Sequence, residues 1–425
     1  MAAQSNMEDD FPYKRLYGDM LADISRRFIA LSHWRPTFRK INYRINNAPE
    51  LQIKNLRFCF AGHCDPTIMT LRASDYEDYN LISDYFIEQH RIRAIRGDDP
   101  KKESVYDYWR AHRAELLKMC SSRDSKEEKL HCARELIYKY KMEVGTFRPT
   151  IAAGLVWMVR NLFGAPCNYV LDPCAGWGDR LIGIMAAGVR GSVHVDPNPD
   201  LGAEYARIEQ WARETASRNV AKDQETAGSS GTLNLTDYRR EYFASPFEDI
   251  PRQDLLQALL RVRGPTGEGV RRAAKPSSDA IKDGPSFTAR DDGFDLTIIA
   301  PPYFDLEIYV PNDVTGTQSI TRFKTWEEWY EKFLIASLAK CASVLRVGGV
   351  LALIINEPPD RSSPRFLARL GGDVIRAARS YRTEGQDSRQ IQMRYLGVIS
   401  YAEFDEQKHH IRSPQPIWLW MRERQ

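Results

Sequence analysis

The stretch that decides the fold runs from Asn168 to Asp200 and reads NYVLDPCAGWGDRLIGIMAAGVRGSVHVDPNPD. An apolar run ends at Asp172, a turn of small residues follows, and residues 181–187 then have helical character. A second apolar run ends on another acid, Asp196. This order predicts strand, tight turn, helix and strand, with both acids at the carboxyl edge of a parallel sheet, where ligands bind. Glycines in such a turn allow unusual backbone angles and a close approach of the ligand.

The spacing of these glycines argues against a phosphate-binding loop. A dinucleotide site needs G-x-G-x-x-G and a P-loop needs G-x-x-x-x-G-K-[ST], and neither pattern occurs here. The observed pattern, D-x-x-A-G-x-G with an acid ending the next strand, resembles motifs I and II of S-adenosylmethionine-dependent methyltransferases. The resemblance implies that Asp172 and the turn face the methionine part of the cofactor, and that Asp196 accepts hydrogen bonds from the ribose hydroxyls. The turn residues concerned are Ala175, Gly176 and Gly178. Another α/β crossover with a glycine turn is the alternative.

The composition fits a globular protein. The chain has 425 residues and a net charge of +3, so a nucleic-acid surface would need local clustering of basic side chains. No apolar run reaches the roughly 18 residues of a membrane span, and the first residues are acidic where a signal peptide is basic. We therefore expect a soluble, intracellular protein in the cytoplasm or nucleus, with no membrane partner.

The cysteines favour a reducing compartment. There are 7 of them, an odd number without framework spacing, which suits free thiols better than a disulfide scaffold. Cys59, His63 and Cys64 lie close together, but no second ligand pair follows at finger spacing. We therefore expect no metal site.

Residues 1–145 predict a mostly helical region. Amphipathic helix patterns occur at 16–31, 79–93, 106–118 and 126–140, and a strand-like segment at 51–60. Between Arg26 and Arg44, basic side chains alternate with aromatic ones. This pattern is typical of sites that hold single-stranded or flipped nucleic acid, and it also fits a helix with aromatic core residues and a solvated basic face. The region is thus a candidate for binding nucleic acid, a protein partner or a second copy of the chain.

Two weaker matches flank the central stretch. The segment GTFRPT, residues 145–150, precedes an apolar helix and resembles motif X of amino-group methyltransferases. The resemblance implies that Phe147, Pro149 and Thr150 lie beside the methionine end of the cofactor; Pro149 also suits the first turn of a helix.

The segment REYFASPFEDI, residues 240–250, takes the place of the third motif. There the resemblance implies that Phe247 and Glu248, or Asp249 instead, surround the adenine. Polar and small residues near 214–231 and 264–293 predict mobile loops or insertions.

The second strong signal is the tetrapeptide Ala300-Pro301-Pro302-Tyr303, which ends the predicted strand 295–299. Two successive prolines cannot continue a sheet ladder because neither has an N–H to donate, so they would form a rigid ledge at the ligand edge. The tetrapeptide resembles motif IV, (D/N/S)-P-P-(Y/F/W), of methyltransferases that act on exocyclic amino groups, chiefly adenine N6 and cytosine N4.

The chemistry explains these residue types. An exocyclic amino nitrogen is a poor nucleophile because its lone pair is delocalised into the ring, and acceptors that hold its hydrogens let it become pyramidal. The resemblance assigns this role to the carbonyls fixed by Pro301 and Pro302 and to the side chain before them, while Tyr303 stacks on a base that has left its neighbours. Catalysis then depends on positioning and electrostatics rather than on a strong base.

Position 300 departs from the motif, because Ala cannot supply the side-chain acceptor. Loss of one transition-state hydrogen bond costs about 2–4 kcal/mol, or two to three decades in rate. Three explanations follow from the residue alone: reduced or lost activity in a natural binding protein, an engineered inactivating change, or a substitute acceptor such as Asp305.

The remaining elements continue the same order. An amphipathic helix at 326–345 leads through a Gly-Gly turn to a buried strand at 350–355, and two antiparallel strands follow near 395–404 and 416–421. Arginines outnumber acids between 358 and 394, which suits phosphate contacts or a solvated helix face. The fold class predicted is α/β: a Rossmann-like methyltransferase domain at 146–425, with a mainly parallel sheet and a terminal antiparallel hairpin, after an N-terminal mostly helical region at 1–145.

The resemblance implies an S-adenosylmethionine-dependent methyltransferase that acts on an exocyclic amino group of a nucleic-acid base. Adenine N6 is favoured over cytosine N4, and DNA over RNA. A catalytically silent nucleic-acid-binding or scaffold subunit is the first alternative, and Ala300 favours it. A protein glutamine methyltransferase, which also uses a Pro-Pro-Tyr ledge, is the second; it normally has Asn at the first position and would leave the basic and aromatic clusters unexplained.

Overall fold

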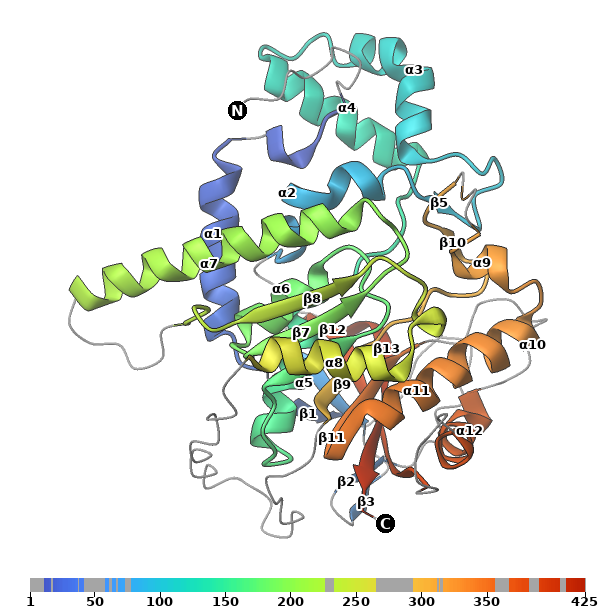
Figure 1. Ribbon diagram of the computed structural model, residues 1–425. Coiled ribbons are helices and arrows are strands. Elements are labelled where there is room, and N and C mark those ends of the chain that lie inside the picture. The colour runs from blue at the N-terminus through green and yellow to red at the C-terminus, as the bar shows by residue number, and fades with distance from the viewer. Residues whose placement is uncertain are drawn as a thin grey trace.

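A nine-stranded sheet forms the middle layer of the protein (Figure 1). The computed structural model describes residues 11–16, 18–36, 38–41, 58–60, 63–65, 68–72, 78–225, 233–264, 293–311, 313, 316–355, 367–381, 390–405 and 410–424. The strand order is β1-β4-β12-β13-β11-β9-β6-β7-β8. The strands are β1 (Phe38–Ile41), β4 (Ile68–Arg72), β6 (Tyr169–Asp172), β7 (Gly191–Val195), β8 (Arg239–Phe243), β9 (Phe294–Ile299), β11 (Leu345–Ile354), β12 (Gln392–Asp405) and β13 (His410–Glu423).

The direction in which the chain adds strands reverses between β6 and β9. From β6 the chain proceeds through β7 to β8 in parallel steps, and then returns to β9 on the other side of β6 before it reaches β11. β13 pairs antiparallel with both β11 and β12, which forms the predicted terminal hairpin. Such a reversal leaves a crevice at the carboxyl ends of the two strands. The predicted α/β, Rossmann-like fold is therefore confirmed.

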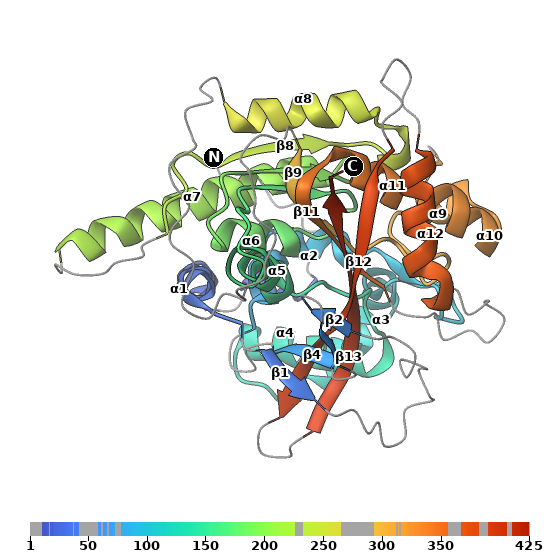
Figure 2. The ribbon, with the colours of Figure 1, turned by 90° about the horizontal axis from the view of Figure 1, so that it is seen from below.

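Helices cover both faces of the sheet, as Figure 2 shows. One face carries α1 (Met20–His33), α2 (Asn80–Arg91), α5 (Pro149–Asn161), α6 (Asp179–Ala186) and α7 (Leu201–Glu225). The other carries α8 (Arg252–Arg263), α12 (Leu367–Ser380), and the continuous helix of α10 (Trp326–Glu328), a π-helical segment η4 (Trp329–Ile335) and α11 (Ala336–Val344).

The pleat of β11 supplies both hydrophobic cores. Val350 and Ala352 belong to the core under α5 and α6, while Leu351 and Leu353 belong to the core under α8 and α11. Successive side chains of a strand point to opposite faces, so a strand covered on both sides reads as a continuous apolar run. This explains the buried run predicted at 350–355.

The N-terminal region is mostly helical, as predicted, and it also extends the sheet. α3 (Val105–Met119) and α4 (Lys126–Tyr140) form a hairpin with a small core of its own, beside the short helix η1 (Lys14–Leu16). α1 and α2 pack instead on α6 and α7, and β4 pairs in parallel with β12. Two short ladders complete the region: β2 (Phe58–Phe60) with β3 (His63–Asp65), and β5 (Ile95–Arg96) with β10 (Glu307–Ile308). The division at residue 145 into separate folding units stays a prediction.

The polar stretch at 214–231 corrects an expectation. Residues 214–225 are not a loop, because α7 continues through Glu225. Ion pairs one turn apart support the exposed end of this helix: Arg218 Nη2 lies 3.1 Å from a carboxylate oxygen of Glu214. Polarity there reflects exposure rather than loss of helix. Residues 226–232 and most of the second predicted insertion, 265–292, lie outside the described residues.

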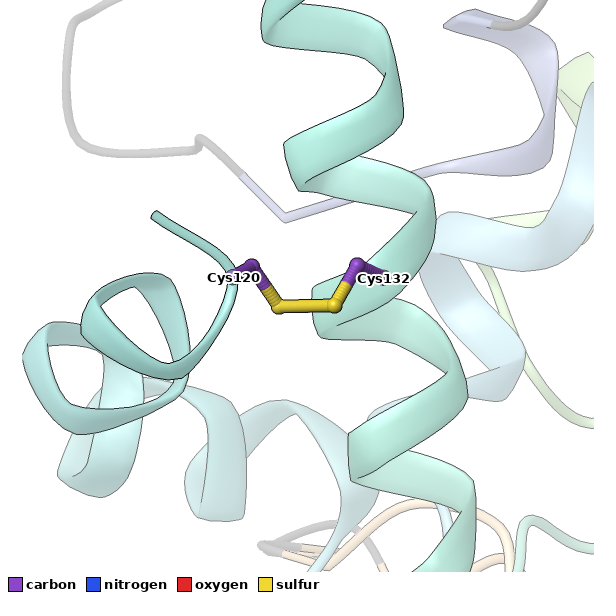
Figure 3. The surroundings of a disulfide bond; sticks show 2 residues. All are labelled: Cys120 and Cys132. Carbon is purple, nitrogen blue, oxygen red and sulfur yellow. A yellow bond between two sulfur atoms is a disulfide. The ribbon is translucent and has the colours of Figure 1, made fainter. Parts of the chain in front are cut away.

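One cysteine pair differs from the expectation of free thiols. Cys120, which ends α3, forms a disulfide with Cys132 in α4 (Figure 3). The antiparallel packing of the two helices brings the sulfurs together across a separation of 12 residues. Cys167, Cys174 and Cys341 are free. In the described part of the chain, no helix is both long and apolar enough to cross a membrane.

Candidate functional site

The carboxyl ends of β6 and β9 open on a cavity of about 930 Å³. This volume lies at the upper end of the range for ligand pockets. Ten residues predicted from the sequence line the cavity: Phe147, Ala175, Gly176, Asp196, Phe247, Glu248, Ala300, Pro301, Pro302 and Tyr303. The two strong motifs, more than a hundred residues apart in the chain, thus share one wall.

Four other predicted cofactor residues lie outside that lining: Pro149, Thr150, Asp172 and Gly178. Pro149 and Thr150 begin α5 and are buried. Gly178 precedes α6 with a φ of 83°, and a Cβ there would come within 2.9 Å of Ile208. These three residues pack behind the residues that line the cavity, and their contact with a cofactor stays a prediction.

Asp172 is fully buried and faces two basic groups instead of the cavity. Its Oδ1 accepts a hydrogen bond of 2.8 Å from Arg180 Nε, and its Oδ2 lies 3.2 Å from His194 Nδ1. Burial by itself raises the pKa of Asp172, but the charge of Arg180 and the hydrogen bond of His194 outweigh burial and hold the pKa below its usual value. Asp172 therefore remains an anion that anchors Arg180.

The other nitrogen of His194 continues a buried network. His194 Nε2 lies 2.7 Å from Ser192 Oγ, which lies 2.5 Å from the hydroxyl of Tyr238. Ser192, His194 and Asp172 have the order of a hydrolase triad, yet each has 0% of its surface exposed. No substrate reaches the serine, so this network orders the core beneath the site.

Asp196 presents a carboxylate to the cavity at the end of β7. Its Oδ2 accepts a hydrogen bond of 2.8 Å from the backbone N–H of Gly176, and its Oδ1 accepts one of 3.0 Å from Asn198. A carboxylate oxygen has two lone pairs, so each oxygen can accept a further hydrogen bond. Burial raises the pKa of Asp196 to about 6.

The segment Phe247–Asp249 closes another side of the cavity as the short helix η3. Lys340 Nζ donates to the carbonyls of Phe247 and Glu248 at 3.0 and 2.9 Å and fixes their backbone. Arg322 pairs with Asp249 at 2.6 Å and with Glu248 at 3.3 Å, and Asp249 is absent from the lining. Of the two acids considered for the adenine, Glu248 is therefore the one in the wall.

The loop after Tyr303 forms the roof of the cavity, and two of its acids behave differently. Asp305 is exposed and absent from the lining, so the structure does not place it as a substitute acceptor for Ala300. Glu307 lines the cavity, where its Oε1 accepts from the N–H of Gly145 at 2.7 Å and its Oε2 from the hydroxyl of Tyr309 at 2.6 Å. Glu307 thus belongs to the pocket.

The roof is held by the N-terminal region. The N–H of Gly97 donates to the carbonyl of Leu306 at 2.6 Å, next to the ladder between β5 and β10. Figure 1 shows β5 and β10 side by side. The ring of Tyr309 packs edge-on against Trp177 in the glycine turn, with 5.9 Å between the ring centroids. The roof and the turn of the first motif are therefore in direct contact.

A polar chamber extends the cavity toward α2, and sequence reasoning missed it. Asn80 Nδ2 and Ser83 Oγ donate to Asp179 Oδ1 at 3.1 and 2.5 Å, and burial raises the pKa of Asp179 to about 7. Lys14 and Arg91 also line the chamber, and both pair with Asp84. In sequence Asn80, Ser83 and Arg91 are only polar positions of the amphipathic helix predicted at 79–93, so no local signal marks them. Among the described residues, no group of three His, Cys, Asp or Glu could hold a metal ion.

The comparisons with known proteins yield structural matches alone. No protein-family model matches the chain, and no curated protein does either. One solved structure, assigned as a class I S-adenosylmethionine-dependent methyltransferase from Listeria monocytogenes, is 10% identical, with 81% of each chain covered and a TM-score of 0.33. Another, assigned as the RNA methyltransferase PH1948 from Pyrococcus horikoshii, is 11% identical, with 74% of this chain and 100% of that chain covered and a TM-score of 0.30.

A third match contains a ligand. SMU.776, assigned as a methyltransferase complexed with SAH, is 10% identical to the chain, with a TM-score of 0.33. The match covers 66% of this chain and 51% of SMU.776, so the chain spans about half the length of that structure. With TM-scores this low, the sheet order and the cavity remain the grounds for the fold and the site.

Proposed function

We propose that the protein is an S-adenosylmethionine-dependent methyltransferase that acts on an exocyclic amino group of a nucleic-acid base. Adenine N6 is the favoured target, and DNA is favoured over RNA. One observation carries the proposal: the Pro-Pro-Tyr ledge and the Asp196 turn line the same cavity, at the point where the order of the strands reverses. A methyl donor and an amino acceptor bound there would lie next to each other.

The wall suits the parts of the cofactor, which when bound supplies an electrophilic methyl group on a sulfonium. Asp196 has lone pairs for the ribose hydroxyls, and Phe247 and Glu248 lie in the wall where the adenine would bind. These two acids, with Glu307, also favour the positive charge of the sulfonium. The residues present therefore fit S-adenosylmethionine.

The ledge acts on the acceptor. Pro301 and Pro302 fix the carbonyls at the end of β9, which can hold the hydrogens of the target amino group and turn its lone pair toward the methyl group. Tyr303, also in the wall, offers a ring on which an extruded base can stack. Transfer would form the N–C bond, break the S–C bond of the methyl group to leave a neutral thioether, and release one amino proton to water, so the residues need only position the base.

The test is transfer of a labelled methyl group to pools of DNA and RNA, followed by mass spectrometry of the nucleosides. The expected product is N6-methyladenine in DNA. Tyr303→Ala should bind the cofactor normally but make little product, because it removes the stacking ring alone. A label that passes to peptides and resists competition by oligonucleotides would instead indicate the glutamine methyltransferase.

A second candidate is a silent subunit that binds nucleic acid without transfer. Ala300 favours this function, because the wall lacks the side-chain acceptor of the motif and Asp305 lies outside the lining. The candidate predicts binding of nucleic acid but no labelled product, both from the wild type and from variants with Ser or Asp at position 300.

The raised pKa of Asp196 predicts a pH dependence of cofactor binding. The carboxylate, rather than the neutral acid, is the better acceptor for two ribose hydroxyls, and burial raises its pKa to about 6. Affinity for S-adenosylmethionine should therefore be constant above pH 7 and fall about tenfold for each unit below about pH 6. Calorimetric titration between pH 5 and 8 measures this, with Asp196→Asn as the control whose weak binding should lack the tenfold fall per unit below about pH 6. An equal slope in both proteins would contradict the assignment.

A further inference from the structure

Four basic side chains line the cavity: Lys14, Arg91, Arg148 and Arg180. Lys14 and Arg91 already share Asp84, and Arg91 also pairs with Glu143 at 2.5 Å. Arg148 is exposed. Arg91 and Arg180 are both buried, but Arg180 pairs with one carboxylate where Arg91 pairs with two, and Arg180 lies against the glycine turn.

Three contacts fix the guanidinium of Arg180. Its Nε donates to Asp172 at 2.8 Å, its Nη2 donates to the carbonyl of Cys174, and its central carbon lies 4.8 Å from the centroid of the Phe147 ring. A Cβ on Gly176 would lie 3.7 Å from the same Nη2, so the guanidinium lies beside the turn. In the described part of the chain, its Nη1 has no hydrogen-bond partner. The guanidinium of Arg180 thus lines the cavity as a fixed hydrogen-bond donor, and its Nη1 can donate to a ligand.

The charges of the cofactor indicate what this donor would bind. The sulfonium and the ammonium are cations, which suit Asp196, Glu248 and Glu307, whereas the α-carboxylate is the only anion and needs a cationic partner. The planar fork of arginine matches a carboxylate in shape, and burial strengthens such a pair because water does not screen it. The resemblance to motif I implied that an acid, Asp172, faces the methionine part; in the structure the basic Arg180 takes that place in the wall.

We infer that Arg180 binds the α-carboxylate of the cofactor's methionine part, and that Asp172 is the positioning residue that holds the guanidinium against the turn. This inference rests on the proposed function, since it needs a cofactor with an amino-acid tail. It assigns the recognition of the cofactor's α-carboxylate to the ion pair of Asp172 in β6 with Arg180 in α6.

Decarboxylated S-adenosylmethionine is the probe, because it keeps the adenosine, the sulfonium and the amine and lacks only the carboxylate. The full chain should bind S-adenosylmethionine about 10- to 100-fold more tightly than the decarboxylated form, as a charged hydrogen-bonded pair is worth. In the double variant Asp172→Asn/Arg180→Met, which removes both charges together, this ratio should fall to near one while affinity for the decarboxylated form stays the same. Calorimetric titration of both ligands gives the ratio.

Arg148→Met is the matched control, because Arg148 is a second arginine in the same wall. It should keep the full ratio, and a ratio that collapses in Arg148→Met but persists in the double variant overturns the inference. If the double variant does not fold, Arg180→Lys decides, because it keeps the charge and loses the fork: the ratio should drop by about tenfold. Failure of the proposed function looks different, since the wild type would then bind neither ligand.

Discussion

Replacement of Ala300 with Ser should increase the rate of methyl transfer by about 100-fold, because it restores an acceptor for the second amino hydrogen at the ledge. Ala300 lines the cavity directly before Pro301, so a hydroxyl at this position enters the wall without a change of the backbone. Asp at position 300 should act in the same direction. The measurement is the initial rate of labelled methyl transfer to DNA at saturating cofactor.

Asp305→Asn is the matched control for this variant. Asp305 is exposed and outside the lining, so its substitution should leave the rate unchanged both in the wild type and in Ala300→Ser. A rate that collapses in Asp305→Asn would show that the loop supplies the acceptor after all. Absence of product from every variant, together with intact binding of nucleic acid, would favour the silent subunit.

Replacement of Asp172 with Ala should lower the free energy of unfolding at pH 7 by about 3–5 kcal/mol, because it leaves the guanidinium of Arg180 buried without a counter-charge. Asp172 has 0% of its surface exposed, and Arg180 has 4%. The measurement is the urea denaturation midpoint of the full chain, by fluorescence and by circular dichroism.

The loss of stability in Asp172→Ala should depend on pH. The pKa of Asp172 is lower in the folded than in the unfolded chain, so its contribution to stability is present above the ordinary value of 3.8 and is lost as the pH falls through the folded pKa. The difference in the free energy of unfolding between wild type and Asp172→Ala should therefore be at its full value at pH 7 and become smaller in acid. Asp179→Asn is the control: burial raises the pKa of Asp179 to about 7, so this acid is half neutral already and the loss should stay near 1 kcal/mol. Equal losses in the two variants would contradict the role of buried charge.

The sequence alone predicts those parts of the site in which one short segment determines both the backbone conformation and the chemistry. The strand before Asp172, the glycine turn and the Pro-Pro pair each combine a conformational restriction with a place at the sheet edge, and the structure puts both motifs on one cavity. The α/β class and the terminal hairpin followed from the same alternation of apolar runs and helical spacing.

What sequence reasoning could not supply depends on contacts between distant segments. Asp172 and Arg180 are only eight residues apart, yet which of them faces the ligand depends on His194 from the next strand, which takes the second carboxylate oxygen. The polar residues at the end of α7 favour a loop when only the sequence is considered, because an exposed helix lacks the apolar stripe that periodicity detects. The addition of β4 beside β12 joins segments more than three hundred residues apart, and no local pattern encodes it.

The short ladder between β5 and β10 anchors the loop over the site to the N-terminal region of the chain. Gly97 admits no side chain, because a Cβ there would overlap the carbonyl oxygen of Asp305 at 1.9 Å. A chain shortened to begin after β5 and Gly97 would keep the Pro-Pro-Tyr ledge and lose the anchor of the loop that follows the ledge. Random mutagenesis for altered turnover should therefore yield substitutions around residues 95–97, about two hundred positions away from the ledge that they hold in place.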